Sequence, residues 1–495
     1  MVIGDLKKTA VRSAGINVIS NSIGFIFQTV GVIVLARLLT PKDFGLVAMV
    51  SAFSMWIMNF GINGFTEYII QKKDINTLEI NSIFWTHLFL ASLLFVCFIL
   101  FGFFLVYFYK EPALSGISAV MASSFILYAL YTCHFAVLKR EMKFTYIASA
   151  QLIAVILSIG LSISAAFIGL GYWAVVIRQL TLPIIAVIAA WIIRPWRPQR
   201  PQNLLNALPA LKYAIKVYSN FSLSYLSRNI DNVLLGKCHG STVLGNYDRA
   251  YYLSQQPIAQ LLQPLTSVAL ATLSRIRQDK IKFAAYYIKV VSTISFIGMA
   301  VTISFMLTAQ DIVLLLLGPA WTETGKILMA LIPALAATLT SGTNSWLYLS
   351  LGQPGRWFRW NIIATSFTVL AFIIAAPFGA VAMGIAYSTK AYILLLPGLW
   401  YAGRPIQLSP KKLLNSIWPY HSSAVIIAAF WLYISSHWMP LSLFLSELHT
   451  IIRVALVACT ATFLYISLVA LFERSFKSVY DFIALVKLFF KRDDA

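Results

Sequence analysis

Charged side chains stand inside a segment that is otherwise apolar enough to cross a membrane, SRNIDNVLLG at residues 227–236. A helix would place Arg228 and Asp231 on one face, because they are three residues apart. Asn220 and Ser224 continue the same face. A charge at the centre of a bilayer costs roughly 2.5–3.5 kcal/mol on insertion scales, so such residues face protein or a water-filled cavity. Side chains of this kind can pair with each other, bind an ionic substrate or bind a coupling ion.

The next segment has a polar face of its own. It carries Asp248, Tyr252, Gln256, Gln260 and Gln263. Asp231 and Arg249 lie nine residues on either side of Gly240, so an antiparallel hairpin would bring them level. We therefore expect Asp231 to pair with Arg228 and Arg249. Such a network either pins two helices together or lines a transport path, where Asp231 and Asp248 are candidates for coupling to a cation or proton.

Two further cations, Arg178 and Lys390, have no acidic residue within four positions along the chain. A cation packed among membrane helices faces protein or water, so both side chains either line an anion site or pair with carboxylates on other helices. The candidate partners are Glu67, Asp231 and Asp248. With the amides of the polar faces, the predicted substrate-binding set is Arg178, Arg228, Arg249, Lys390, Gln28, Gln256 and Gln260.

Motifs typical of enzymes are missing from the sequence. It contains no GxSxG, no HExxH and no phosphate-binding P-loop, and no connection between apolar segments is long enough to fold as a catalytic domain. The four cysteines show no CxxC spacing, so we expect four buried thiols and neither a metal site nor a disulfide. We therefore predict a protein that is not an enzyme and binds no cofactor or metal.

The elements that position these residues follow from the composition. Of 495 residues, 59% are hydrophobic and 11% are charged, against about half and about a quarter in a soluble domain. Apolar runs of about 20 residues recur along the chain, each long enough to cross a bilayer. We predict an all-α polytopic membrane protein with about fourteen spans: 13–36, 45–68, 82–108, 114–136, 146–168, 172–193, 212–236, 244–270, 284–309, 324–350, 358–377, 380–402, 414–435 and 450–472. Re-entrant hairpins at Gly169–Gly171 or Pro377–Gly379 would reduce the number to twelve.

Positive charge predicts the orientation. Of the 38 Lys and Arg residues, 27 fall in every second loop and the two tails, whereas 6 fall in the opposite loops. Basic loops stay in the cytoplasm, so both termini are predicted to be cytoplasmic. The net charge of +21 is spread over eight short segments, which fits a surface next to anionic lipid and argues against a nucleic-acid interface.

The chain repeats internally. VLARLLTPKDFGLVA (34–48) aligns with LLGKCHGSTVLGNYD (234–248) at an offset of 200, and IGLGYWAVVI (168–177) aligns with APFGAVAMGI (376–385) at an offset of 208. Two matches in the same order indicate a duplication with six spans per copy. An even number of spans gives both copies the same orientation, so the axis relating them runs along the membrane normal. We predict an N-terminal lobe at 1–200, a C-terminal lobe at 201–405, two additional spans at 406–472 and a cytoplasmic amphipathic tail at 473–495.

Several segments resemble the polysaccharide transporter branch of the MOP flippase superfamily, and within it the Wzx-type exporters of the colanic-acid kind. The resemblance covers about residues 5–400 and is carried by these stretches: VLARLLTPKDFGLVAM (34–49), IIQKKD (69–74), VLKREMKF (137–144), RPWRPQ (194–199), LSRNIDNVLLGKCHGSTVLGNYDRAYYL (226–253) and LLLLGPAW (314–321).

This resemblance implies two six-helix lobes around a central cationic cavity, with two additional helices. It implies a flippase of the bacterial inner membrane that moves undecaprenyl-pyrophosphate-linked oligosaccharide repeat units from the cytoplasmic to the periplasmic leaflet for exopolysaccharide, capsule or O-antigen synthesis. Alternating access driven by an ion gradient or the membrane potential is expected. The partners would be the lipid-linked oligosaccharide, membrane lipids and the polymerase or export machinery. The alternative is an ion-coupled exporter of small molecules (multidrug type) with the same fold, for which an acidic cavity is expected.

Overall fold

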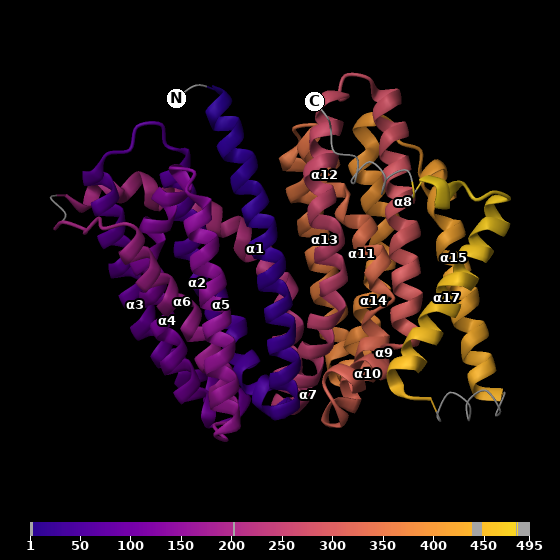
Figure 1. The fold of residues 1–495 in the computed structure, drawn as a ribbon, viewed down its shortest axis with the longest axis horizontal. Helices are drawn as coiled ribbons and strands as arrows, with labels where there is room; N and C mark the ends of the chain where they lie inside the picture. The colour runs from indigo at the N-terminus through magenta and orange to yellow at the C-terminus, as the bar shows by residue number, and fades with distance from the viewer. Residues whose placement is uncertain (1–2, 201–202, 438–447, 482, 484–495) are drawn as a thin grey trace. The chain divides into compact units, whose positions relative to one another are not determined.

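The computed structural model describes residues 3–200, 203–437, 448–481 and 483, and these residues form helices joined by short connections, without a strand (Figure 1). Helices are expected, because a backbone inside lipid must satisfy its hydrogen bonds within the segment. The helices of the first half are α1 (Ile3–Leu38), α2 (Pro41–Gln71), α3 (Thr77–Tyr109), α4 (Ala113–Arg140), α5 (Phe144–Phe167), α6 (Tyr172–Ile193), η1 (Leu204–Ala207) and α7 (Leu208–Arg275).

The second half continues with a larger number of short helices. They are α8 (Lys280–Leu307), α9 (Ala309–Leu316), η2 (Pro319–Trp321), α10 (Thr322–Leu331), α11 (Ala334–Gly342), α12 (Asn344–Ser350), α13 (Pro354–Ala375), η3 (Ala376–Phe378), α14 (Ala380–Gly403), η4 (Arg404–Ile406), α15 (Pro410–His437) and α17 (Thr450–Glu473).

The predicted all-α polytopic class is confirmed. In the described part of the chain, ten helices are long and apolar enough to cross a membrane, or eleven if the pair bent by 52° at 331–334 counts as one span. The predicted segments at 212–236 and 244–270 both lie in α7, which is broken at Gly240 (φ 81°, ψ −177°). The predicted segment at 324–350 is divided among α10, α11 and α12. The total of fourteen spans stays a prediction.

The chain forms two compact units, Met1–Gly245 and Asn246–Ala495. In the first unit, α2 and α3 pack on α4, while α5 packs on α1 and α6. In the second, α8 packs on α11, α15 and α17. The boundaries of these units differ from those of the predicted lobes at 1–200 and 201–405. The lobes stay a prediction, as do the additional spans at 406–472. Most of the predicted tail at 473–495 lies outside the described residues.

Two turns are compatible with the predicted duplication, which stays a prediction. Gly171 directly precedes α6 with φ 55°, and Gly379 directly precedes α14 with φ 93°. The repeat alignment pairs these two glycines, and both adopt the positive φ that residues with a Cβ rarely adopt. The expectation of four buried thiols is wrong for three cysteines: Cys133 is buried, whereas Cys97, Cys238 and Cys459 are exposed.

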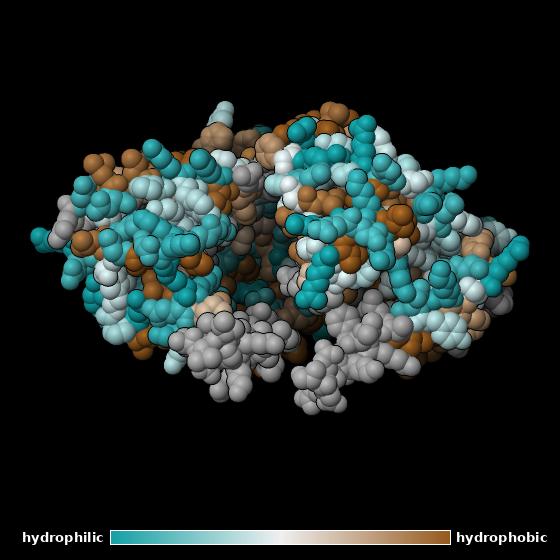
Figure 2. Space-filling view, turned by 90° about the horizontal axis from the view of Figure 1, so that it is seen from above, coloured by the Kyte–Doolittle hydropathy of each residue, from teal (hydrophilic) through white to brown (hydrophobic). Residues whose placement is uncertain are grey.

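Polar side chains gather at one end of the first unit, the end at which α1 begins. Figure 2 looks onto this end and shows hydrophilic residues over much of it. Here α4 ends with Lys139 and Arg140, and the turn to α5 carries Glu141 and Lys143. The charge pattern predicts that this end is cytoplasmic.

Candidate functional site

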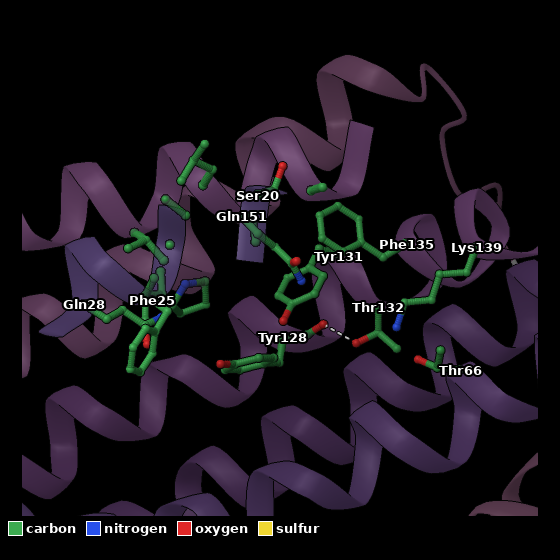
Figure 3. A pocket seen from close by; sticks show the side chains of 18 residues that line it. Ser20, Phe25, Gln28, Thr66, Tyr128, Tyr131, Thr132, Phe135, Lys139 and Gln151 are labelled. Carbon is green, nitrogen blue, oxygen red and sulfur yellow. Dashed lines mark hydrogen bonds between the residues drawn. The ribbon is translucent and has the colours of Figure 1, made fainter. Parts of the chain in front are cut away.

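A polar cavity of about 410 Å³ lies among the helices of the first unit (Figure 3). Its volume falls within the range of about 300–1,000 Å³ that is usual for small-molecule sites. Helices α1, α2, α4, α5 and α6 contribute the lining residues: Ser20, Gly24, Phe25, Gln28, Thr66, Tyr128, Tyr131, Thr132, Phe135, Lys139, Ala148, Gln151, Leu152, Ala154, Val155, Leu182, Pro183 and Ala186.

Helical periodicity explains why these residues meet. On α4, the lining residues Tyr128, Thr132, Phe135 and Lys139 follow one another at intervals of three or four, which places them on one face. The same spacing holds on α1, where Gly24 separates Ser20 from Gln28. Glycine and alanine at several lining positions leave room that larger side chains would fill.

The wall from α4 is aromatic and well packed. The rings of Tyr128 and Tyr131 have centroids 5.3 Å apart, and Tyr131 lies 5.0 Å from Phe135. The Thr132 hydroxyl donates to the carbonyl of Tyr128 at 2.6 Å, which fixes its rotamer. Figure 3 shows the Gln151 side chain reaching in from α5 toward Tyr131. Aromatic surface with a few convergent polar groups is typical of a ligand site.

A single lining residue carries a charge among those that the structure describes, and it is Lys139. Its side chain is half-buried, and Figure 3 shows it running into the cavity with its ammonium group toward Thr132 and Thr66. No described lining residue is acidic. The cavity therefore presents hydroxyls, amides and one cation.

The predicted site residues of the first unit lie at several different places. Gln28 lines the cavity. Arg178 is half-buried on α6, and its neighbour Gln179 lines a smaller cavity of about 80 Å³ and hydrogen-bonds to Ser51 at 3.2–3.4 Å.

The charges of the opening motif lie on α7. Asp231 is 2% exposed, and its carboxylate accepts a hydrogen bond from the backbone N–H of Asn232 at 2.9 Å. Arg228 is exposed. The predicted network through Asp231 stays a prediction.

The predicted residues of the second unit have partners of their own. Arg249 forms an ion pair with Asp248 at 2.5 Å, and its guanidinium lies 5.3 Å from the centroid of the Tyr252 ring. Gln256 is half-buried and Gln260 is exposed.

Lys390, also in the second unit, packs against aromatic rings. Its Nζ lies 4.6 Å from the centroid of the Tyr387 ring, 5.7 Å from that of Phe372 and 3.4 Å from Thr368 Oγ1. Tyr387 in turn accepts a hydrogen bond from Gln255 at 3.3 Å. These contacts show how a membrane-embedded cation is accommodated by ring faces and a hydroxyl.

Four lining residues were not predicted from the sequence: Tyr128, Tyr131, Lys139 and Gln151. An aromatic stripe at helical spacing is more often packing than a site, and Lys139 stands among the basic loop residues that indicate orientation. The signal available was the continuation of the α4 stripe from Tyr128 to Lys139 at intervals of three or four.

Comparison with known proteins gives consistent similarities. A family model described as polysaccharide biosynthesis protein matches residues 34–326, more than half of the chain. The lipopolysaccharide biosynthesis protein WzxC of Escherichia coli K12 is 22% identical over 420 residues, which cover 83% of this chain and 84% of WzxC.

Two solved structures share the fold. The lipid II flippase MurJ in an inward closed conformation superimposes with a TM-score of 0.71 at 13% identity, covering 94% of this chain and 99% of MurJ. An inward-facing multidrug resistance MATE transporter of the MOP superfamily gives a TM-score of 0.61 at 16% identity, covering 79% and 98%. At these identities the likeness concerns the fold alone.

Proposed function

The chain belongs to the polysaccharide biosynthesis protein family, and on this basis we propose that it is a flippase for lipid-linked oligosaccharides. Its cargo is an undecaprenyl-pyrophosphate-linked repeat unit, moved from the cytoplasmic to the periplasmic leaflet of the bacterial inner membrane for surface polysaccharide synthesis. The observation that carries the proposal is the polar cavity of about 410 Å³ among membrane helices, lined by Gln28, Gln151, Tyr131 and Lys139.

Physical chemistry explains the need for such a cavity. A pyrophosphate and several sugars do not cross hydrocarbon unaided, because each unsatisfied polar group costs several kcal/mol there. Hydroxyls, amides and an ammonium group replace the hydrogen bonds that the head group loses on leaving water. The prenyl chain remains in lipid and needs no such partners. The protein accordingly provides a polar path for the head group and neither forms nor breaks a covalent bond in it.

The composition of the cavity separates this function from a second candidate. The fold likeness to an inward-facing multidrug transporter favours export of small molecules. Exporters of organic cations are expected to present carboxylates, whereas the described lining has one cation and no carboxylate. A neutral or anionic cargo fits this lining better.

The remaining predicted residues have roles in this scheme. Arg178, Arg228, Arg249 and Lys390 stabilise the pyrophosphate at successive stages of alternating access. Asp231 and Asp248 couple transport to a cation or proton gradient, since Asp231 is buried and carboxylates bind such ions. Both termini lie in the cytoplasm, where the tail at 473–495 meets the polymerase or export machinery.

The experiment measures the pool of undecaprenyl-linked oligosaccharide and its leaflet sidedness in a deletion strain, in the complemented strain and with Arg228→Ala. We expect completed repeat units to accumulate on the cytoplasmic side of the deletion strain while surface polysaccharide disappears. Arg228→Ala should reproduce part of this accumulation. A normal pool with normal surface polysaccharide would contradict the proposal, and altered drug resistance alone would favour the second candidate.

A further inference from the structure

Most cationic side chains around the end of α4 are engaged by other groups, and Lys73 is exposed. The engaged ones are Lys143 with Glu141 (2.8 Å), Arg194 with Glu141 (2.5 Å), Lys72 with Glu79 (2.7 Å), and Arg140 with the carbonyl oxygens of Ile69 (2.8 Å), Lys72 and Lys73. Within the described chain, Lys139 forms no ion pair and no hydrogen bond. Among these cations, Lys139 is thus a half-buried one that lines the cavity without such a partner.

The ammonium group of Lys139 has fewer partners in the cavity than a partly buried charge normally has. Lys139 is half-buried, so its charge has lost part of its hydration, and charges withdrawn from water are normally paired. The groups that Figure 3 places ahead of its ammonium, Thr132 and Thr66, are hydroxyls and carry no charge. Both are buried, with 2% and 8% of their surface exposed. An anionic oxygen between these groups would accept hydrogen bonds from the ammonium group and from the Thr66 hydroxyl, whereas the single hydroxyl hydrogen of Thr132 is donated to the carbonyl of Tyr128.

The rest of the cavity fits a sugar ring. Gln28 and Gln151 offer amides that both donate and accept, as hydroxyl groups of a sugar require. The rings of Tyr128 and Tyr131 form an adjacent wall that can pack against an apolar ring face. Cation, amides and aromatic wall together match a saccharide that carries a negative charge.

We propose that this cavity binds an acidic sugar of the repeat unit, a ring bearing a carboxylate, and that Lys139 is the residue that recognises the carboxylate. The inference rests on the proposed flippase function and names the substrate class of its cavity. The number of charges distinguishes a carboxylate from the pyrophosphate. One ammonium neutralises one carboxylate, whereas a doubly charged pyrophosphate would retain a negative charge in a cavity without a second described cation.

The first test is the composition of the surface polysaccharide that disappears in the deletion strain. Its hydrolysate should contain at least one sugar with a carboxylate in each repeat unit. A polymer of neutral sugars only would overturn the inference while leaving the flippase function intact. If no polymer disappears and no lipid-linked pool accumulates, the function itself fails, so the two failures are distinguishable.

The second test uses the full chain in proteoliposomes with lipid-linked oligosaccharide isolated from the deletion strain. One half of this cargo is used as isolated, and the other half after reduction of its carboxyl group to an alcohol. Lys139→Gln should slow translocation of the acidic cargo about tenfold to a hundredfold, the usual effect of losing a bond to a charged group. Translocation of the reduced cargo should change by less than about twofold.

Three variants complete this test. Lys139→Arg keeps the charge and should restore most of the rate with the acidic cargo. Lys143→Gln, four residues further on, removes a cation that pairs with Glu141 outside the cavity, and it should leave both rates unchanged. Equal slowing of both cargoes by Lys139→Gln would overturn the inference, because the group contacted would then be the pyrophosphate common to both. Unchanged rates with both cargoes would also overturn it.

Discussion

Gly45 and Gly245 pack backbone against backbone in the first unit, although 200 residues separate them. A Cβ on Gly45 would lie 1.7 Å from the carbonyl oxygen of Ser241, and a Cβ on Gly245 would lie 1.8 Å from that of Pro41. Pro41 and Ser241 are themselves 200 residues apart. Gly45 thus lies against Ser241, and Gly245 lies against Pro41, the residue that corresponds to Ser241 in the repeat alignment. Two contacts exchanged in this way are the pattern expected across a two-fold axis.

This contact predicts that Gly45→Ala is destabilising. A backbone carbonyl cannot turn away as a flexible side chain can, so α2 and α7 must separate, at a cost of about 1–3 kcal/mol as in other overpacked sites. The melting temperature of the purified protein should fall, and surface polysaccharide should fall with it. Gly160→Ala is the matched control, because nothing lies within 4 Å of its added Cβ. Equal melting temperatures for Gly45→Ala and the parent protein would contradict the prediction.

A bulky side chain in the cavity should stop transport without unfolding the protein. Ala186 lines the cavity from α6, and Ala186→Phe would occupy much of the space that the head group needs. We expect normal amounts of protein in the membrane, with lipid-linked oligosaccharide accumulating on the cytoplasmic side. Ser164→Phe adds similar bulk on the exposed face of α5 and serves as the control. An undiminished transport rate for Ala186→Phe would show that the cargo does not pass through the cavity.

Removing the buried carboxylate of Asp231 should change how transport responds to ions. If Asp231 binds the coupling ion, Asp231→Asn will lower the transport rate and abolish its dependence on pH or on the driving cation. Asp74→Asn removes an exposed carboxylate from the turn between α2 and α3 and should leave both unchanged. The measurement is the transport rate of both variants and the parent protein in a series of pH and cation gradients. Residual transport with the parent protein's pH and ion dependence would exclude Asp231 from coupling.

The turn after α4 should contribute a stability that depends on pH. Burial raises the pKa of Glu141, but hydrogen bonds from Lys143 and Arg194 outweigh it and hold the pKa below its ordinary value of 4.5. A group whose pKa is lower in the folded state stabilises the fold above its unfolded pKa and loses this effect as the pH falls through the folded value. The melting temperature should therefore decline below about pH 4.5, and less steeply in Glu141→Gln.

A control separates this carboxylate from the general effect of acid. Glu323 pairs with Lys326 but its side chain is 62% exposed, and exposed pairs contribute little. Glu323→Gln should therefore follow the parent protein's decline closely. An identical acid decline in Glu141→Gln and the parent protein would show that the turn contributes nothing.

Much of the fold could be predicted from the sequence, because in lipid the length and polarity of a segment largely determine its structure. The apolar runs gave the helices, and Gly240 marked the break in α7. The division of 324–350 into α10, α11 and α12 was missed, since hydropathy averages over a run and does not detect a bend of 52° within it.

The candidate site could be predicted only in part. Gln28 belonged to the predicted substrate-binding set, but the aromatic stripe of α4 has the pattern of ordinary packing. The pairing of Asp231 with Arg249 was expected from their equal distance to Gly240 along the hairpin, and it stays a prediction. The structure also shows an ion pair between Arg249 and the adjacent Asp248, which the sequence spacing did not indicate. The spacing of residues along a helix predicts where their Cα atoms lie, but it does not predict which neighbour a long, flexible side chain contacts.

Two adjacent residues at the end of α4, Lys139 and Arg140, make different kinds of contact. Arg140 donates to carbonyl oxygens at the end of α2 and holds α4 at a fixed rotation about its axis, while Lys139 points into the cavity. Because the anchoring residue is separate from the residue proposed to bind the cargo, we expect a mutation at position 139 to alter selectivity without loosening the helix. Under the proposed function, a single exchange at this position would suffice to change which acidic cargo is accepted, while the packing of α4 on α2 is kept.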